Sequence, residues 1–140
     1  MGFKKEDIDI VLTTHMHMDH IGWYTQWSHD QWIPTFPNAK YIFVKKEYDF
    51  WKNTPHNGNI DTSFALIDSI EPIMNTKQAE FVSDNFAIDD TIYFEQAFGH
   101  TPGQVMIHIK SKGKYLIIAG DIFHHPIQVN QPHWTADYKT

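Results

Sequence analysis

The sequence predicts a layered α/β or α+β fold, and three observations point to it. Short segments rich in β-branched and apolar residues recur along the chain. Segments with helical spacing lie between groups of these strand-like segments. Clusters of histidine, aspartate and glycine follow several of them directly. Because strand groups separated by helices pack into layers around one core, we expect a single domain over residues 1–140.

Composition and charge limit the classes of function. The chain is 41% hydrophobic and 15% aromatic, which is typical of a globular protein and excludes disorder by composition. A formal net charge of −6 and the lack of a basic run argue against a nucleic-acid partner. No apolar run approaches the ~18 residues of a membrane helix, and residues 1–10 lack the apolar core of a signal peptide. We therefore expect no membrane partner and a cytoplasmic location.

The first half of the chain contains two predicted strands and a short helix. Residues 4–7 have the charge of a helix end, and residues 8–14 (IDIVLTT) predict a buried strand. The aromatic-rich segment 21–38, which contains two prolines, predicts an irregular loop. A second strand is expected at residues 39–44 and a short helix at residues 45–53.

The second half begins with a turn cluster at residues 53–59 and a segment of helical spacing at residues 61–81. Asp61 and Thr62 are candidate N-caps for that helix, and Pro72 must break or kink it. Strands follow at residues 91–97, 104–110 and 115–119, with a hairpin turn at residues 111–114 (SKGK) and the last strand (YLIIA) buried. In the middle strand, Val105, Ile107 and Ile109 are expected on one face.

The stretch THMHMDHIGW contains the pattern H-x-H-x-D-H at residues 15–20. In extended backbone His15 and His17 project to the same side, so two imidazoles can bind one metal ion. Asp19 and His20 are adjacent, and their side chains point in different directions. Such a pair is suited to bind a neighbouring ion. A chain of this composition is expected to contain well under one such pattern by chance. Since the chain has no cysteine, any metal site must be built from His, Asp and Glu.

Two further clusters lie at the ends of predicted strands. His100 stands in GHTPG, a sharp loop between two strands, and Asp121 follows Gly120 directly after a strand. Each is a weak signal alone, because loop histidines are usually solvated and Gly-Asp is common. Together with H-x-H-x-D-H they all lie at strand ends, where α/β proteins gather their sites.

This ordered set resembles the metallo-β-lactamase superfamily, whose signature is H-x-H-x-D-H, then a later His, then a later Asp. HIGW, PTFPNAKY and GDIFHHPIQ resemble one hydrolase branch of it. The resemblance implies an α+β fold, the four-layer αββα sandwich of the family. It also implies a first metal ion on His15, His17 and His100, a second on Asp19 and His20, and Asp121 bridging both.

The family pattern also contains a histidine for the second metal well downstream of the bridging Asp. Here residue 140 is only nineteen positions past Asp121. His124 and His125 are expected to stand too close to Asp121 for that part, and His133 falls short of the expected separation. Only a short lead precedes the H-x-H motif. We therefore expect a partial domain, with the segment that completes it supplied by a longer chain or a homo-oligomer.

The chemistry implied by the resemblance is hydrolysis by a pair of divalent ions. Such a pair lowers the pKa of a bridging water toward ~7 and holds metal-bound hydroxide ready to attack. Zinc is the expected metal, with Mn, Fe or Co as alternatives. Asp19 is the expected catalytic residue, orienting the hydroxide or moving its proton.

The expected substrate is a small molecule of the ester, lactone or phosphotriester type. Five aromatic residues follow the motif and would either line its pocket or pack over a sheet: Trp23, Tyr24, Trp27, Trp32 and Phe36. Lactone-hydrolysing relatives often have a Tyr where this chain has His124. His29, His56 and His108 are expected to be solvated or packed. The alternative function is a catalytically silent fragment or metal-binding scaffold that lacks the last ligand, and a single-metal protein is a third interpretation.

Overall fold

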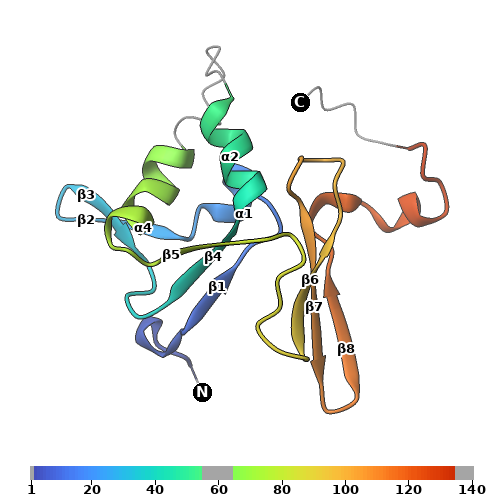
Figure 1. The fold of residues 1–140 in the computed structure, drawn as a ribbon, viewed down its shortest axis with the longest axis horizontal. Helices are drawn as coiled ribbons and strands as arrows, with labels where there is room; N and C mark the ends of the chain where they lie inside the picture. Colours follow the sequence, from blue (N-terminus) through green and yellow to red (C-terminus); the bar gives the residue numbers. More distant parts are fainter. Residues whose placement is uncertain (1, 55–64, 135–140) are drawn as a thin grey trace.

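The computed structural model describes residues 2–54 and 65–134, which form three β-sheets with helical segments between them (Figure 1). The strands are β1 (Ile10–Leu12), β2 (Thr25–Ser28), β3 (Gln31–Pro34), β4 (Lys40–Val44), β5 (Ala79–Val82), β6 (Ile92–Gln96), β7 (Val105–Ser111) and β8 (Lys114–Ile118). The helices are α1 (Met18–Ile21), α2 (Lys45–Asn53), the π-helix η2 (Ala65–Ile70), α4 (Glu71–Asn75), and the 3-10 helices η1 (Lys5–Asp7), η3 (Gly120–Ile122) and η4 (Pro126–Val129).

The first sheet is parallel, in the order β1-β4-β5, and carries helices on one face. Tyr41 and Phe43 point from β4 into a core cluster with Trp51 of α2, Ile70 of η2 and Ile73 of α4. Tyr41, Phe43, Ile70 and Ile73 are at most 1% exposed. Because successive side chains of β4 point to opposite faces of the sheet, one face of this strand is covered by the helices.

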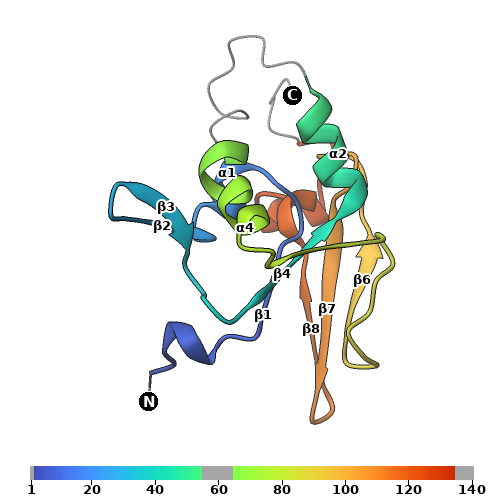
Figure 2. The ribbon, with the colours of Figure 1, turned by 60° about the vertical axis from the view of Figure 1, so that its left-hand side comes forward.

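The second sheet is antiparallel, in the order β6-β7-β8, and packs on the other face of β4. Ile42 and Val44 of β4 meet Phe94, Val105 and Ile107 in a second core cluster. Figures 1 and 2 place α4 and this sheet on opposite sides of β4. Three layers, helix on sheet on sheet, are thus formed by the described residues.

The expected irregular loop at residues 21–38 was wrong, because it contains the antiparallel hairpin β2–β3. Its two-residue turn is made by His29 and Asp30, with φ of 49° and 58°. Asp and His tolerate the left-handed region better than most residues, so the turn closes without glycine. The turn of the β7–β8 hairpin, at Lys112 and Gly113, was predicted correctly.

Of the helix expected at residues 61–81, the structure contains the part from η2 to α4, at residues 65–75. Residues 55–64, with His56, Asp61, Thr62 and most of the predicted turn cluster, lie outside the described part of the chain. Pro72 stands in the first turn of α4, where its missing N–H costs nothing, so it starts a helix rather than breaking one. Lys77, with φ of 61°, follows the helix, and β5 then pairs in parallel with β4.

The expected burial of two strands was also wrong. Each residue of β8 is exposed, because β8 is the edge strand of its sheet within the described residues. In β1, Ile10 is 41% exposed and the other two residues are half-buried. In contrast, Val105 and Ile107 lie in the core with Ile109 packed against it, as the alternation of residues 104–110 predicts.

No helix among the described residues combines the length and apolar character that a membrane span requires.

We expect the substitution Ile107→Ala to lower the free energy of unfolding by about 2–5 kcal/mol, since it opens a cavity where the side chain is buried. The matched control is Ile117→Ala on the neighbouring strand, whose side chain is 42% exposed and should lose less than half as much. Urea unfolding followed by tryptophan fluorescence measures both. Equal losses would contradict the difference in burial between β7 and β8.

Candidate metal centre

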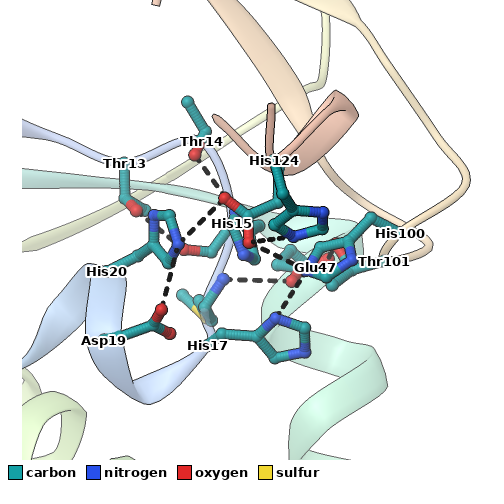
Figure 3. Close-up of polar contacts among 12 residues, drawn as sticks. Thr13, Thr14, His15, His17, Asp19, His20, Glu47, His100, Thr101 and His124 are labelled. Atoms are coloured by element: carbon teal, nitrogen blue, oxygen red, sulfur yellow. Dashed lines mark hydrogen bonds and ion pairs between the residues drawn. The ribbon is translucent and has the colours of Figure 1, made fainter. Parts of the chain in front are cut away.

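The histidine cluster begins where β1 ends. His15 lies between β1 and α1 and is 1% exposed. His17 is the N-cap of α1, with φ of −68° and ψ of 151°, and the single turn of α1 then carries Asp19 and His20. A short helix directly after an extended segment thus points His15, His17 and His20 toward one region, as Figure 3 shows.

His100 and Asp121 reach the same region from the second sheet. Their donor atoms and those of the cluster form three overlapping sets, in each of which all atoms lie within 4.8 Å of one another. The sets are His15, His17 and His100; His15, His20 and Asp121; and His100, Asp121 and His124. Loops after β1, β6 and β8 supply these residues, so the sheets meet at this centre.

The first set is the most enclosed. His17 Nδ1 lies 2.8 Å from His100 Nε2. The ring of His15 stands edge-on to both, with centroids 4.8 Å and 4.9 Å away. The three imidazoles therefore bring donor nitrogens within 4.8 Å of one another, close enough to share one zinc-like ion.

Asp121 lies between the first set and His20. Its Oδ1 is 3.2 Å from His20 Nε2, and its Oδ2 is 3.6 Å from His100 Nε2. A carboxylate with one oxygen toward each neighbour is suited to bridging two cations.

Asp19 is not brought into any of the three sets. Its Oδ2 lies 3.5 Å from His20 Nε2, and its side chain is 73% exposed. Its assignment as a ligand and as the catalytic residue stays a prediction.

A buried carboxylate, that of Glu47 in α2, connects the loops of the centre (Figure 3). Glu47 Oε1 accepts hydrogen bonds from Met16 N at 3.1 Å and from Trp51 Nε1 at 2.7 Å. Its Oε2 accepts from Thr101 Oγ1 and Gly103 N, both at 2.8 Å. Four donors on one carboxylate fix the backbone beside His15, His17 and His100, because charge-assisted hydrogen bonds are strong and directional.

Two glycines allow the chain segments to approach this closely. A Cβ on Gly103 would lie 2.5 Å from Glu47 N. Gly120 has φ of 56°, and a Cβ there would lie 2.6 Å from Thr14 Oγ1. Larger residues at either position would push the GHTPG loop or Asp121 away from the histidine cluster.

The state of His15 fits a metal ligand. Its Nδ1 faces Thr14 Oγ1 at 3.1 Å, whereas its buried Nε2 has no hydrogen-bond partner among the described residues. A buried nitrogen without a partner is costly unless something binds it, and an ion would do so. Thr14 would then fix the ring orientation from the other nitrogen, as such partners of metal-binding histidines do.

The electrostatics of the cluster favour the forms that bind metal. Burial, followed by the imidazoles of His20, His17 and His100, lowers the pKa of His15 to about 3. Burial and His100 also lower the pKa of His17. Burial alone would raise the pKa of Asp121, but His20 and the hydrogen bond from His124 outweigh it and hold that pKa below its usual value. Neutral imidazoles and an ionised carboxylate are the forms that bind divalent cations.

Comparison with known proteins identifies the family. The model of the metallo-beta-lactamase superfamily matches residues 1–137. The chain belongs to the metallo-beta-lactamase superfamily. No match was found among curated proteins.

Three solved structures, one of them described as a member of the beta lactamase superfamily, share the fold. The hydrolase AbOPH has 25% identity and a TM-score of 0.78, over 94% of this chain and 47% of its own. A probable metal-dependent hydrolase from Staphylococcus aureus has 24% identity and a TM-score of 0.70, over 87% and 41%. AidC, a dizinc quorum-quenching lactonase in complex with a product, has 26% identity and a TM-score of 0.67, over 83% and 42%.

These similarities confirm the metallo-β-lactamase-like fold expected from the sequence. The present chain spans less than half the length of each of the three proteins. The sequence resemblance predicted a four-layer αββα sandwich that is incomplete here, in line with the three layers formed by the described residues.

The sequence indicated the donors of this superfamily member but not what holds them together. Glu47 was missed because Lys45, Lys46 and Asp49 surround it in the sequence, and nothing there distinguishes the buried charge from the exposed ones. His124 was expected to stand too close to Asp121 to be the downstream histidine of the family pattern, and in the structure its donor atom lies in the third of these sets.

We expect Glu47→Gln to lower the free energy of unfolding by about 2–3 kcal/mol, because the amide would turn its own N–H₂ toward groups that donate, and buried donors would lose their acceptor. Asp49→Asn on the same helix is the control. Its exposed ion pair with Lys45 should contribute less than about 0.5 kcal/mol. Thermal and urea unfolding measure both variants, and similar losses would show that Glu47 has no special structural role.

We expect the metal-free protein to lose stability as the pH falls below about 6.5, the ordinary pKa of histidine. His15 and His17 stay neutral in the folded state because their pKa values are lowered, whereas in the unfolded chain they take up protons. Their contribution is complete above pH 6.5 and decreases as the pH falls toward the folded-state value of about 3 for His15.

The measurement is the melting temperature of chelator-treated protein at pH 7.5 and pH 5, at constant salt. The melting temperature should be lower at pH 5, and His15→Gln should reduce the difference, while His133→Ala, at an exposed position, should leave it unchanged. Identical melting temperatures at the two pH values would contradict the burial of neutral imidazoles.

Proposed function

We propose that this protein is a binuclear metal-dependent hydrolase of esters, lactones or phosphotriesters. One observation carries the proposal, namely that His15, His17, His20, His100 and Asp121 converge from three loops at the meeting point of two sheets. We assign a first ion to His15, His17 and His100, and a second to Asp19 and His20, with Asp121 shared.

Two divalent ions at such a centre, zinc in the first instance, would acidify water and polarise a carbonyl or phosphoryl oxygen. The residues of the chain would do the positioning. Thr14 holds the ring of His15, and Glu47 holds the loops that carry His17 and His100. Asp121 supplies negative charge between the two sets. Asp19, whose carboxylate is open to solvent, would accept a proton at Oδ2 and pass it to water.

The relatives support a small-molecule substrate. AidC is a lactonase, and AbOPH is a hydrolase of the same superfamily. The aromatic residues after the motif divide between core and surface. Tyr24 lies in the first core cluster, Trp27 and Trp32 pack edge-to-face across the β2–β3 hairpin, and Trp23 is 83% exposed. Trp23 is therefore the best candidate of the five for contact with an apolar substrate.

A second candidate is a metal-binding scaffold without hydrolytic activity. It is favoured by one observation, that Asp19, the expected catalytic residue, is 73% exposed and lies in none of the three donor sets. In this candidate the donor sets would bind metal, but the last ligand of the family pattern would be lacking.

Metal content and hydrolysis together test the proposal. We expect about two ions per chain after dialysis, by plasma mass spectrometry, and turnover of ester, lactone or phosphotriester substrates. His17→Ala should lose ions and activity, because it removes a donor from the most enclosed set, while His133→Ala should keep both. Two bound ions without turnover would favour the scaffold. A metal content near zero would contradict both candidates for this chain.

A further inference from the structure

His124 lies closer to the centre than its position in the sequence suggests. Gly120 and Asp121 open the 3-10 helix η3, where Gly120 has φ of 56° and Asp121 has φ of −96° and ψ of 34°. The helix η3 ends at Ile122, Phe123 is extended with φ of −149° and ψ of 145°, and His124 lies in the bend that follows. His124 Nε2 lies 3.1 Å from Asp121 Oδ2, the oxygen that also faces His100 at 3.6 Å.

His124 and His100 therefore meet over the same carboxylate oxygen. Their ring centroids are 5.7 Å apart with an interplanar angle of 69°, and their donor atoms lie with Asp121 within 4.8 Å. This third donor set is more open than the first, since the side chain of His124 is 39% exposed and that of His100 is 17% exposed. Two imidazoles and one carboxylate are a common ligand set for divalent transition metals.

The backbone of His124 is held in place by Gln128 of η4. Gln128 Oε1 accepts hydrogen bonds from His124 N at 2.6 Å and from His125 N at 2.9 Å, while its Nε2 donates to Trp134 O at 2.6 Å. His125 Nδ1 accepts from Ile127 N at 3.2 Å and caps the same helix. The position of the His124 ring is thus built by a local network, which is how proteins orient metal ligands.

The geometry points to His124 as a further metal ligand, which with Asp121 Oδ2 would bind the ion assigned to His100 from the solvent-facing side of the centre. This inference rests on the proposed function, because it assumes a metal-binding protein. It assigns to the chain an imidazole ligand on the far side of Asp121 from His20. His124 occupies the position three residues after the aspartate, so it would act from the bend between η3 and η4 rather than from a distant segment.

A role for His124 as a hydrogen-bond donor to Asp121 is the alternative to metal binding. The position of the proton on the imidazole ring distinguishes these two roles. A ring that only donates to Asp121 carries its proton on Nε2. A ring that binds the ion through Nε2 must carry its proton on Nδ1. The ring nitrogen chemical shifts of His124 therefore report its role without any measurement of activity.

The experiment adds Zn²⁺ to the chelator-treated chain labelled with ¹⁵N-histidine. We expect the His124 Nε2 resonance to move to the metal-bound range and the proton to appear on Nδ1. In His124→Gln, which keeps an N–H donor toward Asp121 but loses the imidazole, we expect one equivalent of Zn²⁺ to bind at least tenfold more weakly by calorimetry. His133→Ala, at an exposed position in the same segment, should bind as the unmodified chain does.

The outcomes separate the inference from the proposed function. Zn²⁺ bound at His15 and His17 with no change at His124, or full affinity in His124→Gln, would overturn the inference and leave the proposed function standing. Loss of all Zn²⁺ binding in a folded His124→Gln variant would support the inference, because the ion at His100 would then depend on the imidazole of His124. A chain that binds no Zn²⁺ at all would overturn the proposed function and the inference with it.

Discussion

The buried carboxylate of Glu47 is the interaction on which the rest of the centre depends. It joins the histidine loop after β1, the helix α2 and the GHTPG loop before β7, so that one side chain sets the distance between three segments remote in sequence. Its burial is favourable only because each oxygen accepts two hydrogen bonds. The close packing of Gly103 against α2 follows from the same requirement. The relative position of these segments is therefore fixed by a buried charge as well as by apolar packing.

Local patterns explain what the sequence could predict. The sequence predicts the strand at residues 40–44 and the alternation of residues 105–109, because each depends only on residues close together in the chain. The H-x-H-x-D-H cluster is visible because its members are contiguous. The order of His100 and Asp121 along the chain matched the family pattern, and the sheets then brought them to the cluster.

What the sequence could not predict depends on contacts between distant segments. Burial of β8 was expected from its apolar residues, but burial depends on what covers a strand. The turn at His29 and Asp30 has no glycine signal, so the β2–β3 hairpin was not foreseen. The distance between Asp121 and His124 depends on the short helix η3 and the bend after it, which spacing alone does not reveal.

The exposure of β8 has a consequence for how the protein behaves at high concentration. The strand KYLII pairs with β7 on one side, and within the described residues its other side presents backbone N–H and C=O groups with nothing to satisfy them but water. Tyr115 and Leu116 are more than half exposed. An apolar edge of this kind can pair with another strand. Natural sheets usually protect such an edge with charged side chains or with a covering helix or loop. Within the described residues, β8 is therefore a strand on which another strand can pair, and Lys114 is its one charged residue.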